Sequence, residues 1–506
     1  MQTALDRRAF LKGAAAAGGG LASMGAVERL VARDALGKAK RRSAQPYGPL
    51  RRVADQRGVE VLALPAGFSY VTFSHSGTTM SDGNPTPLAL DGMGAFAGGH
   101  GHRGHSRGKE HLVRLVRNSE DRNPAGTVGG LLGDRSKAYD PTGYGGTCTL
   151  VYDEHRRRLV EDFVSLNGTS TNCAGGIAYR RRYWLTGEEA VGGPDHADAT
   201  ARFAKRHGYL FQTPVDRDAG ELRPGVPLTA AGRFCHEAAA VDQRTGVVYE
   251  TEDPGSGIGA GFYRYTPDDP DDLTAGGELH MLAIAGQPNV DLRQGRTRGQ
   301  ALPVRWVRID EPDPDLERLS DADSTFNQGW SDGGAKFNRL EGCWEDDGTI
   351  FFVSTSGGDR KNGDVNSDGY AEGFGQVWAF RPGSQTLTLV YESKGGGQEA
   401  DSPDNLTVTP RGGLLACEDD ASSAYVDTHP LAPGIENVNR VIGITQGGDA
   451  FEFAVNVLNG SELAGACFSP SGRTLFFNLF GRAAFTEDPT EGMTVAVTGP
   501  WRRGPL

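Results

Sequence analysis

The clearest candidate for chemistry in this sequence is a cysteine that follows an asparagine in a run of small residues. Cys173 lies in the segment TNCAGG, and the carboxyl pair Glu188-Glu189 closes the next apolar run, YWLTGEE. A thiolate favours transition metals, whereas carboxylate oxygens suit hard cations such as calcium. A cysteine among carboxylates is what a mixed metal site would require, and the alternative is a buried thiol beside a solvated turn.

Further acids recur near the ends of other apolar runs. Glu237 directly follows His236, and Arg339 stands two residues before Glu341. The remaining acid and amide positions of this kind are Asp91, Asn118-Ser119-Glu120, Glu252-Asp253, Asp404-Asn405 and Glu418-Asp419. Two carboxylates in close contact repel each other by about 4 kcal/mol at an effective dielectric near 20. If the fold gathers these groups, bound cations are the usual means of relieving the repulsion.

The elements that must position these residues are short strands joined by glycine turns. The segments 238–253, 343–358, 406–420 and 466–480 each hold two runs rich in Val, Phe, Tyr and Thr around a polar turn, which predicts β-hairpins. The turns recur at intervals longer than the roughly 40–50 residues of a short-looped propeller blade. The sequence therefore predicts an all-β propeller with long loop insertions, in which equivalent strand ends meet around one channel mouth. A β-sandwich pair is the alternative, but it does not explain why acids recur at the same end of each hairpin.

Composition narrows the class of protein. The chain has 506 residues, 73 of them glycine, and a formal net charge of -13. This charge argues against a nucleic-acid surface and is compatible with cation binding. The six cysteines form no C-x-x-C pair, so a structural zinc site is not indicated. No later segment is long and apolar enough to cross a bilayer.

The N-terminus carries a targeting pattern. Arg7-Arg8-Ala9-Phe10-Leu11-Lys12 precedes a weakly apolar run of Ala and Gly, as in a twin-arginine export signal. We therefore expect a signal peptide over 1–36, a linker over 37–55 and a single propeller domain over 56–506. Export by the twin-arginine machinery would place the protein in the periplasm or outside the cell. No signal for homo-oligomerisation is visible, and we expect a monomer.

Taken together, the motifs resemble the PhoX-type bacterial alkaline phosphatases from about residue 60 to the end. The resemblance rests on an ordered series of segments: NCAGG (172–176), LTGEE (185–189), FCHEAAAVDQRTGVVYETED (234–253), FYRYTP (262–267), NRLEG (338–342), DNLTVTPRG (404–412), ELAGACFSPSGRTLFFN (462–478) and GPW (499–501). It implies a six-bladed propeller with iron and calcium ions at one channel mouth. It also implies hydrolysis of small phosphate esters.

The resemblance also implies roles for individual residues. Cys173 would be an iron-bound thiolate, and Arg339 would grip the substrate phosphate together with Asn118. Glu237 would act in catalysis as well as in metal binding. The metal ligands implied in full are Cys173, Glu188, Glu237, Glu252, Glu341, Asp404 and Glu418. The chain departs from the family pattern at Ser119, where related sequences usually have histidine, and at Cys235.

Two other functions fit parts of the same pattern. A calcium-dependent lactonase or esterase on a similar propeller would use Glu341 and Asp404-Asn405, but it gives no role to Cys173 or Arg339. In a non-catalytic binding propeller, calcium would only stabilise the loops, and Arg339 would then pair with an internal acid. Fold alone does not decide among the three.

Overall fold

The computed structural model describes residues 45–98, 111–122, 132–196, 203–358, 360–419, 429–481 and 491–506. The expected export signal lies outside these residues. The expected linker over 37–55 is corrected in its C-terminal part, because Leu50–Ala54 forms strand β1 and pairs with the next strand. In the described part of the chain, no helix is long and apolar enough to span a membrane.

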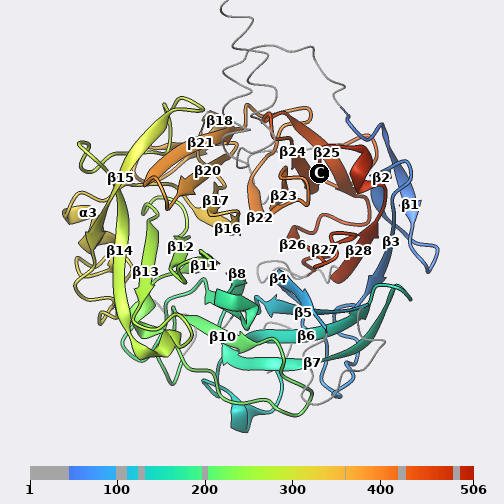
Figure 1. Cartoon of the computed structure of the whole chain (residues 1–506), viewed down its shortest axis with the longest axis horizontal. Coiled ribbons are helices and arrows are strands. Elements are labelled where there is room, and N and C mark those ends of the chain that lie inside the picture. The colour runs from blue at the N-terminus through green and yellow to red at the C-terminus, as the bar shows by residue number, and fades with distance from the viewer. Residues whose placement is uncertain are drawn as a thin grey trace, which may run out of the picture.

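The described strands form antiparallel sheets arranged around a centre (Figure 1). One sheet holds β4 (Leu90–Ala97), β5 (Leu112–Ser119), β6 (Gly145–Asp153) and β7 (Arg158–Thr169), and the next holds β8 (Asn172–Ile177), β9 (Tyr183–Glu188) and β10 (Leu210–Pro214). A nine-stranded sheet follows the order β11 (His236–Val241), β12 (Val248–Glu252), β13 (Phe262–Pro267), β14 (Gly277–Ile284), β15 (Ala301–Arg308), β21 (Thr386–Glu392), β20 (Gln376–Arg381), β17 (Thr349–Ser354) and β16 (Leu340–Asp346).

The two remaining large sheets combine strands from both ends of the chain. Strands β22 (Pro403–Val408), β23 (Leu414–Glu418), β24 (Arg440–Ile444) and β25 (Ala450–Asn456) are extended by β2 (Glu60–Pro65) and β1. Strands β26 (Leu463–Phe468), β27 (Thr474–Leu479) and β28 (Met493–Thr498) are completed by β3 (Ser69–Phe73). Figure 1 shows these N-terminal strands in blue beside the red C-terminal ones. This pairing closes the ring between its first and last sheets and so protects sheet edges.

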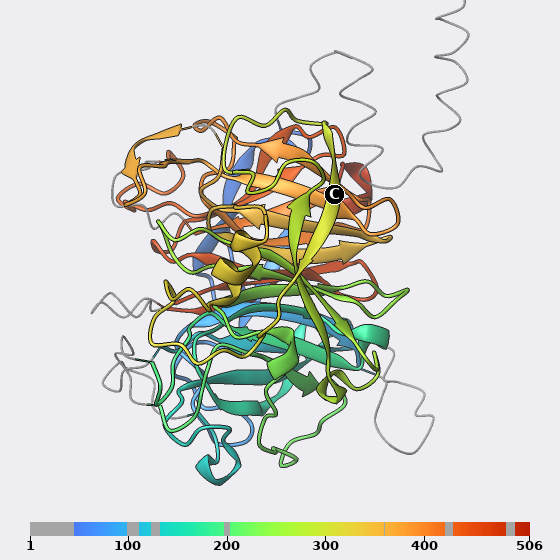
Figure 2. The ribbon, with the colours of Figure 1, turned by 90° about the vertical axis from the view of Figure 1, so that its left-hand side faces the viewer.

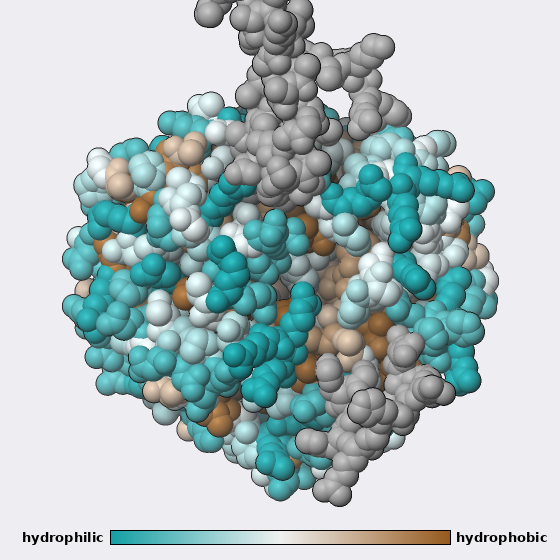
Figure 3. All heavy atoms as spheres, viewed as in Figure 1, coloured by the Kyte–Doolittle hydropathy of each residue, from teal (hydrophilic) through white to brown (hydrophobic). Residues whose placement is uncertain are grey.

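The fold is therefore all-β and propeller-like, as the sequence predicts. The strands β4, β8, β11, β16, β22 and β26 lie innermost, and each contacts the next in that order until β26 meets β4 again. In the side view of Figure 2, loops leave the sheets toward both faces of the ring. The face shown in Figure 3 is mostly hydrophilic, with hydrophobic side chains gathered near its centre.

Hydrophobic side chains between neighbouring sheets hold the ring together. Leu115 and Leu150 of one sheet pack with Phe476 and Ala496 of the adjoining sheet, and all four are fully buried. Helical structure in the described residues is confined to short segments: α3 (Thr325–Ser331) and the 3-10 helices Arg135–Lys137, Tyr179–Arg181, Thr229–Ala231, Leu273–Ala275 and Trp501–Arg503. The outer β18 (Arg360–Val365) and β19 (Ala371–Gly373) form a separate hairpin.

Candidate metal centre

The innermost strands share a local irregularity at the end where they begin. Each of the six departs from regular pairing with its neighbour near its first residues. In five of them the second residue of the strand carries a potential metal ligand, and a β-bulge at such a position re-aims side chains. These five residues are Asp91, Cys173, Glu237, Glu341 and Asp404, and Glu462 directly precedes the sixth strand.

A second row of acids comes from the strand next to the innermost one. In four sheets an acid directly follows the last residue of that strand, at the end where the inner strand begins. These acids are Glu120 after β5, Glu189 after β9, Asp253 after β12 and Asp419 after β23. Residues distant in sequence therefore meet at one end of the channel, as the propeller hypothesis requires.

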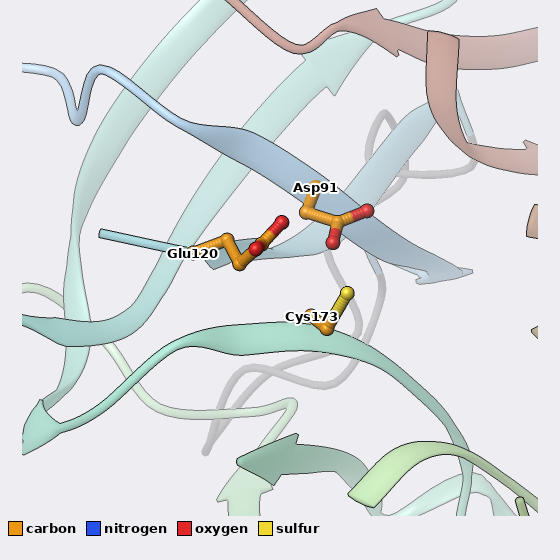
Figure 4. Close-up of side chains that lie close together, drawn as sticks. All are labelled: Asp91, Glu120 and Cys173. Carbon is orange, nitrogen blue, oxygen red and sulfur yellow. The ribbon is translucent and has the colours of Figure 1, made fainter. Parts of the chain in front are cut away.

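The two rows form one continuous cluster of one thiol and nine carboxyl groups. Within the described residues, five overlapping groups have ligand atoms within 4.8 Å of one another: Asp91, Glu120 and Cys173; Cys173, Glu189 and Glu237; Glu189, Asp253 and Glu341; Glu237, Glu341 and Asp404; Asp404, Asp419 and Glu462. Figure 4 shows the first group, in which the thiol and both carboxyl groups point toward one another. Overlapping groups of this kind have room for several cations.

The arrangement has the properties of a site built for cations. Asp91 and Glu237 are fully buried, and none of their carboxyl oxygens accepts a regular hydrogen bond from a described residue. The Cys173 thiol is the polar group that approaches both of them. Buried carboxylates without partners are strongly disfavoured unless an ion satisfies them. The residues therefore fit a bound metal cluster.

Burial and mutual repulsion shift the pKa values of these groups in one direction. Burial, reinforced by Asp404 and Glu189, raises the pKa of Glu237 well above its usual range. Burial and the charge of Asp419 raise the pKa of Asp404 to about 7. Burial and the charge of Asp91 raise the pKa of the Cys173 thiol. Without cations the cluster retains protons, and cations must displace them.

Two arginines contact the cluster. Arg339 donates from Nε and Nη2 to Asp253 Oδ2 at 3.0 and 2.9 Å, and its Nη2 lies 3.1 Å from Glu341 Oε1. Its backbone φ of 43° is a left-handed conformation that few non-glycine residues adopt. Arg122 binds Glu120 and also donates to Glu189 Oε2 at 3.1 Å. Sequence reasoning placed Arg339 at the site and missed Arg122.

Three glutamates expected as ligands point away from the cluster. Glu188 accepts from the backbone amides of Ser170 and Gly208 at 2.9 and 2.8 Å and lies 2.6 Å from His207 Nδ1. Glu252 accepts from the Tyr263 hydroxyl at 2.7 Å and from the amide of Gly261.

Glu418, the third, binds the Arg440 guanidinium with both oxygens, at 2.7 Å each. The physical reason is common to all three. Each is the last residue of its strand, and side chains alternate between the two sides of a strand. The next residue, Glu189, Asp253 or Asp419, therefore lies on the side of the cluster.

Asn118 also differs from its expected role in substrate binding. It is fully buried, and its amide donates to the carbonyls of Cys173 and Ala174 at 2.8 and 2.7 Å. Its carbonyl oxygen accepts from the Trp184 indole at 2.8 Å. Asn118 therefore holds β8 in the place that presents Cys173. Of the expected ligands, the structure brings Cys173, Glu237, Glu341 and Asp404 together.

Six cluster members were not among the ligands that the resemblance implies: Asp91, Glu120, Glu189, Asp253, Asp419 and Glu462, of which all but Glu462 belong to the recurring acids of the sequence analysis. Four of the inner-strand members share one usable signal, which is a glycine or alanine directly after the acid or cysteine: Asp91, Cys173, Glu237 and Glu341. A Cβ at Gly92 would lie 2.5 Å from the Ala174 Cα, and one at Gly342 would lie 2.7 Å from the Asp404 carbonyl oxygen. Neighbouring inner strands thus approach too closely for larger side chains at these positions.

Comparison with known proteins identifies the family of the chain. The family model for alkaline phosphatase PhoX matches residues 45–481. A structure of Pseudomonas fluorescens PhoX in complex with vanadate, a transition state analogue, superposes with a TM-score of 0.61, is 16% identical, and covers 91% of this chain and 99% of its own. A gluconolactonase of Xanthomonas campestris gives a TM-score of 0.36 at 11% identity, covering 90% of this chain and 95% of its own, and that likeness supports no functional argument. No curated protein matches the sequence. The chain belongs to the PhoX alkaline phosphatase family.

Proposed function

We propose that this chain hydrolyses phosphate monoesters at a cluster of iron and calcium ions in the mouth of its channel. The observation that carries the proposal is the gathering of one thiol and nine carboxyl groups, contacted by two arginines, at one end of the inner strands. A lactonase that needs only calcium leaves the thiol and the arginines unexplained.

The donor set supports two kinds of metal. Cys173 belongs to the first two ligand groups, so a transition metal such as iron is best placed there. The group of Asp404, Asp419 and Glu462 offers only carboxylate oxygens, which suit calcium. Residues that we expect to hold these ions are Asp91, Glu120, Cys173, Glu189, Glu237, Asp253, Glu341, Asp404, Asp419 and Glu462.

The chemistry divides between the ions and the side chains. Bound cations would supply charge neutralisation for the transferring phosphoryl oxygens and an activated water. Arg339 is anchored by Asp253 and Glu341, so its guanidinium is fixed before substrate arrives and can orient the phosphate. Glu237 is common to the thiol-containing group and an all-carboxylate group, and its ionised carboxylate would connect the two parts of the site.

Further features belong to the same proposal. The contacts of β4, β8, β11, β16, β22 and β26 in a closed order support six blades in a single domain. Export by the twin-arginine machinery, a periplasmic or extracellular location and a monomeric state are proposed from the sequence, with a signal over 1–36. Folding before export would let the protein carry its metals across the membrane.

The test is metal analysis and p-nitrophenyl phosphate hydrolysis of the exported protein, before and after Cys173→Ala. Cys467→Ala is the matched control, because Cys467 is also buried but lies in a hydrophobic cluster. We expect stoichiometric iron with calcium in the parent protein, and loss of iron and activity only in the Cys173 variant. Calcium alone, with lactone hydrolysis and no phosphatase activity, would refute the proposal.

A further inference from the structure

We propose that Arg122 is a second phosphate-binding residue, which shares the substrate phosphate with Arg339. This inference rests on the proposed phosphatase function. The two arginines contact the same group of metal-ligand side chains. Arg122 contacts Glu189, while Arg339 contacts Asp253 and Glu341, and these three acids form a single group.

Exposure distinguishes the arginines from the acids that they contact. The side chains of Arg122 and Arg339 are 34% and 28% exposed. The side chains of their acidic partners are between 1% and 11% exposed: Glu120, Glu189, Asp253 and Glu341. The guanidinium groups therefore lie between the buried ligands and solvent, where an incoming anion meets them first.

Both arginines supply positive charge that an incoming phosphate needs. A phosphate dianion that approaches nine carboxyl groups needs fixed positive charge on the solvent side of the site. The charges of both Arg122 and Arg339 act on Glu189 and oppose the rise in its pKa that burial causes. Arginine suits phosphate because its planar fork can donate two parallel hydrogen bonds to phosphate oxygens.

The backbone around Arg122 is held in place by the sheet below it. Arg122 follows β5 by three residues, and the neighbouring Asp121 accepts from the Ser119 hydroxyl at 2.9 Å. The carbonyl oxygen of Asp121 accepts from the amide of Thr171, which lies just before β8. Arg122 is thus fixed relative to Cys173, as a phosphate-binding group needs to be.

A different role for the same contacts is a clamp between sheets. Arg122 joins Glu120, which follows β5, to Glu189, which follows β9. If that were its only task, removing it would loosen the metal ligands and leave phosphate affinity unchanged once the metals are bound. The two roles therefore predict different measurements.

The test compares Arg122→Gln and Arg122→Lys with Arg339→Gln and with Arg180→Gln. Arg180 is the control arginine, since it forms an exposed ion pair with Asp271 and neither residue belongs to the metal-ligand cluster. Each protein is first saturated with Fe³⁺ and Ca²⁺, and its metal content is measured. Orthophosphate binding is then followed by titration calorimetry, and KM and kcat are measured with p-nitrophenyl phosphate.

We expect Arg122→Gln to weaken orthophosphate binding and raise KM about tenfold to hundredfold at full metal content, the range for losing charge-assisted hydrogen bonds. Arg122→Lys should fall between the parent and the glutamine variant, and Arg180→Gln should match the parent. Unchanged phosphate affinity at full metal content would overturn the inference, whether or not metal affinity falls. A parent protein that binds phosphate without hydrolysing esters would refute the proposed function, while the binding data would still decide the role of Arg122.

Discussion

The neighbouring acids Glu418 and Asp419 offer the sharpest test of the geometry, because the structure assigns them opposite effects on stability. Glu418 is buried against Arg440, and removing one partner of a buried ion pair costs about 3–5 kcal/mol. Arg440 keeps a contact with Glu452 at 3.0 Å, so we expect Glu418→Gln to cost about 3 kcal/mol. For 506 residues the unfolding entropy is about 1 kcal/mol per degree, so Tm should fall by about 3 °C.

Asp419→Asn should have the opposite effect when cations are absent. The Asp419 carboxylate lies within 4.8 Å of ligand oxygens of Asp404 and Glu462. Two charges at that separation repel by about 3 kcal/mol at an effective dielectric of 20. Removing one charge at pH 8 should therefore raise Tm in chelator by about 1–3 °C. A tenfold loss of calcium affinity corresponds to about 1.4 kcal/mol, so the stabilisation by calcium should shrink by about 1 °C.

Thermal unfolding of the parent and the two variants, in chelator and in saturating calcium at pH 8, measures both effects. Glu418→Gln should unfold earlier than the parent in both conditions by similar amounts. The assignment of the two side chains is refuted if Asp419→Asn destabilises the protein in chelator while keeping the full calcium response. It is equally refuted if Glu418→Gln removes the calcium response.

Three further predictions follow from the same contacts. Cys173→Ser should lose bound iron while retaining calcium, which elemental analysis and the loss of thiolate-to-iron absorption would show. Burial and neighbouring acids raise the pKa values of carboxyl groups in the cluster, to about 7 for Asp404. The metal-free protein should therefore lose stability as pH rises from 4 through 7, whereas its calcium affinity should rise. Thermal unfolding in chelator and calcium titrations across this pH range measure the two effects. Burial tends to lower the pKa of His207, but Glu188 and Asp140 outweigh it and raise that pKa to about 9. His207 should therefore contribute stability below pH 6.5 that is lost as pH rises through 9. In His207→Gln, the free energy of unfolding should vary less with pH across this range.

The fold and the general place of the site were predictable because they follow from patterns that repeat along the chain. Hairpins with glycine turns and acids at one strand end predict a ring with acids at one mouth, and the structure agrees. Arg339 and Glu341 were selected because both belong to the segment NRLEG, on which the family resemblance partly rests, and the fold places Arg339 Nη2 3.1 Å from Glu341 Oε1.

The individual ligands were harder to predict, because the choice between adjacent acids depends on the side of the strand. In the pairs Glu188-Glu189 and Glu252-Asp253 both members are acidic, and composition alone does not separate them. Pairing register and the bulges at the starts of the inner strands decide which member reaches the channel, and these depend on contacts distant in sequence. The polar partners of Glu188 are similarly distant, since His207 lies on a later segment.

The adjacent acids divide one task between them in three sheets. The first member of each pair is anchored inside the protein: Glu188 by His207 and backbone amides, Glu252 by Tyr263, and Glu418 by Arg440. The second member then leaves the strand in a fixed direction, with its carboxyl group in the cluster. Mutual repulsion would otherwise push such carboxylates apart before any cation binds. The buried glutamates therefore make a preorganised cation site possible, and this gives a physical reason why acids occur in pairs where one ligand would suffice.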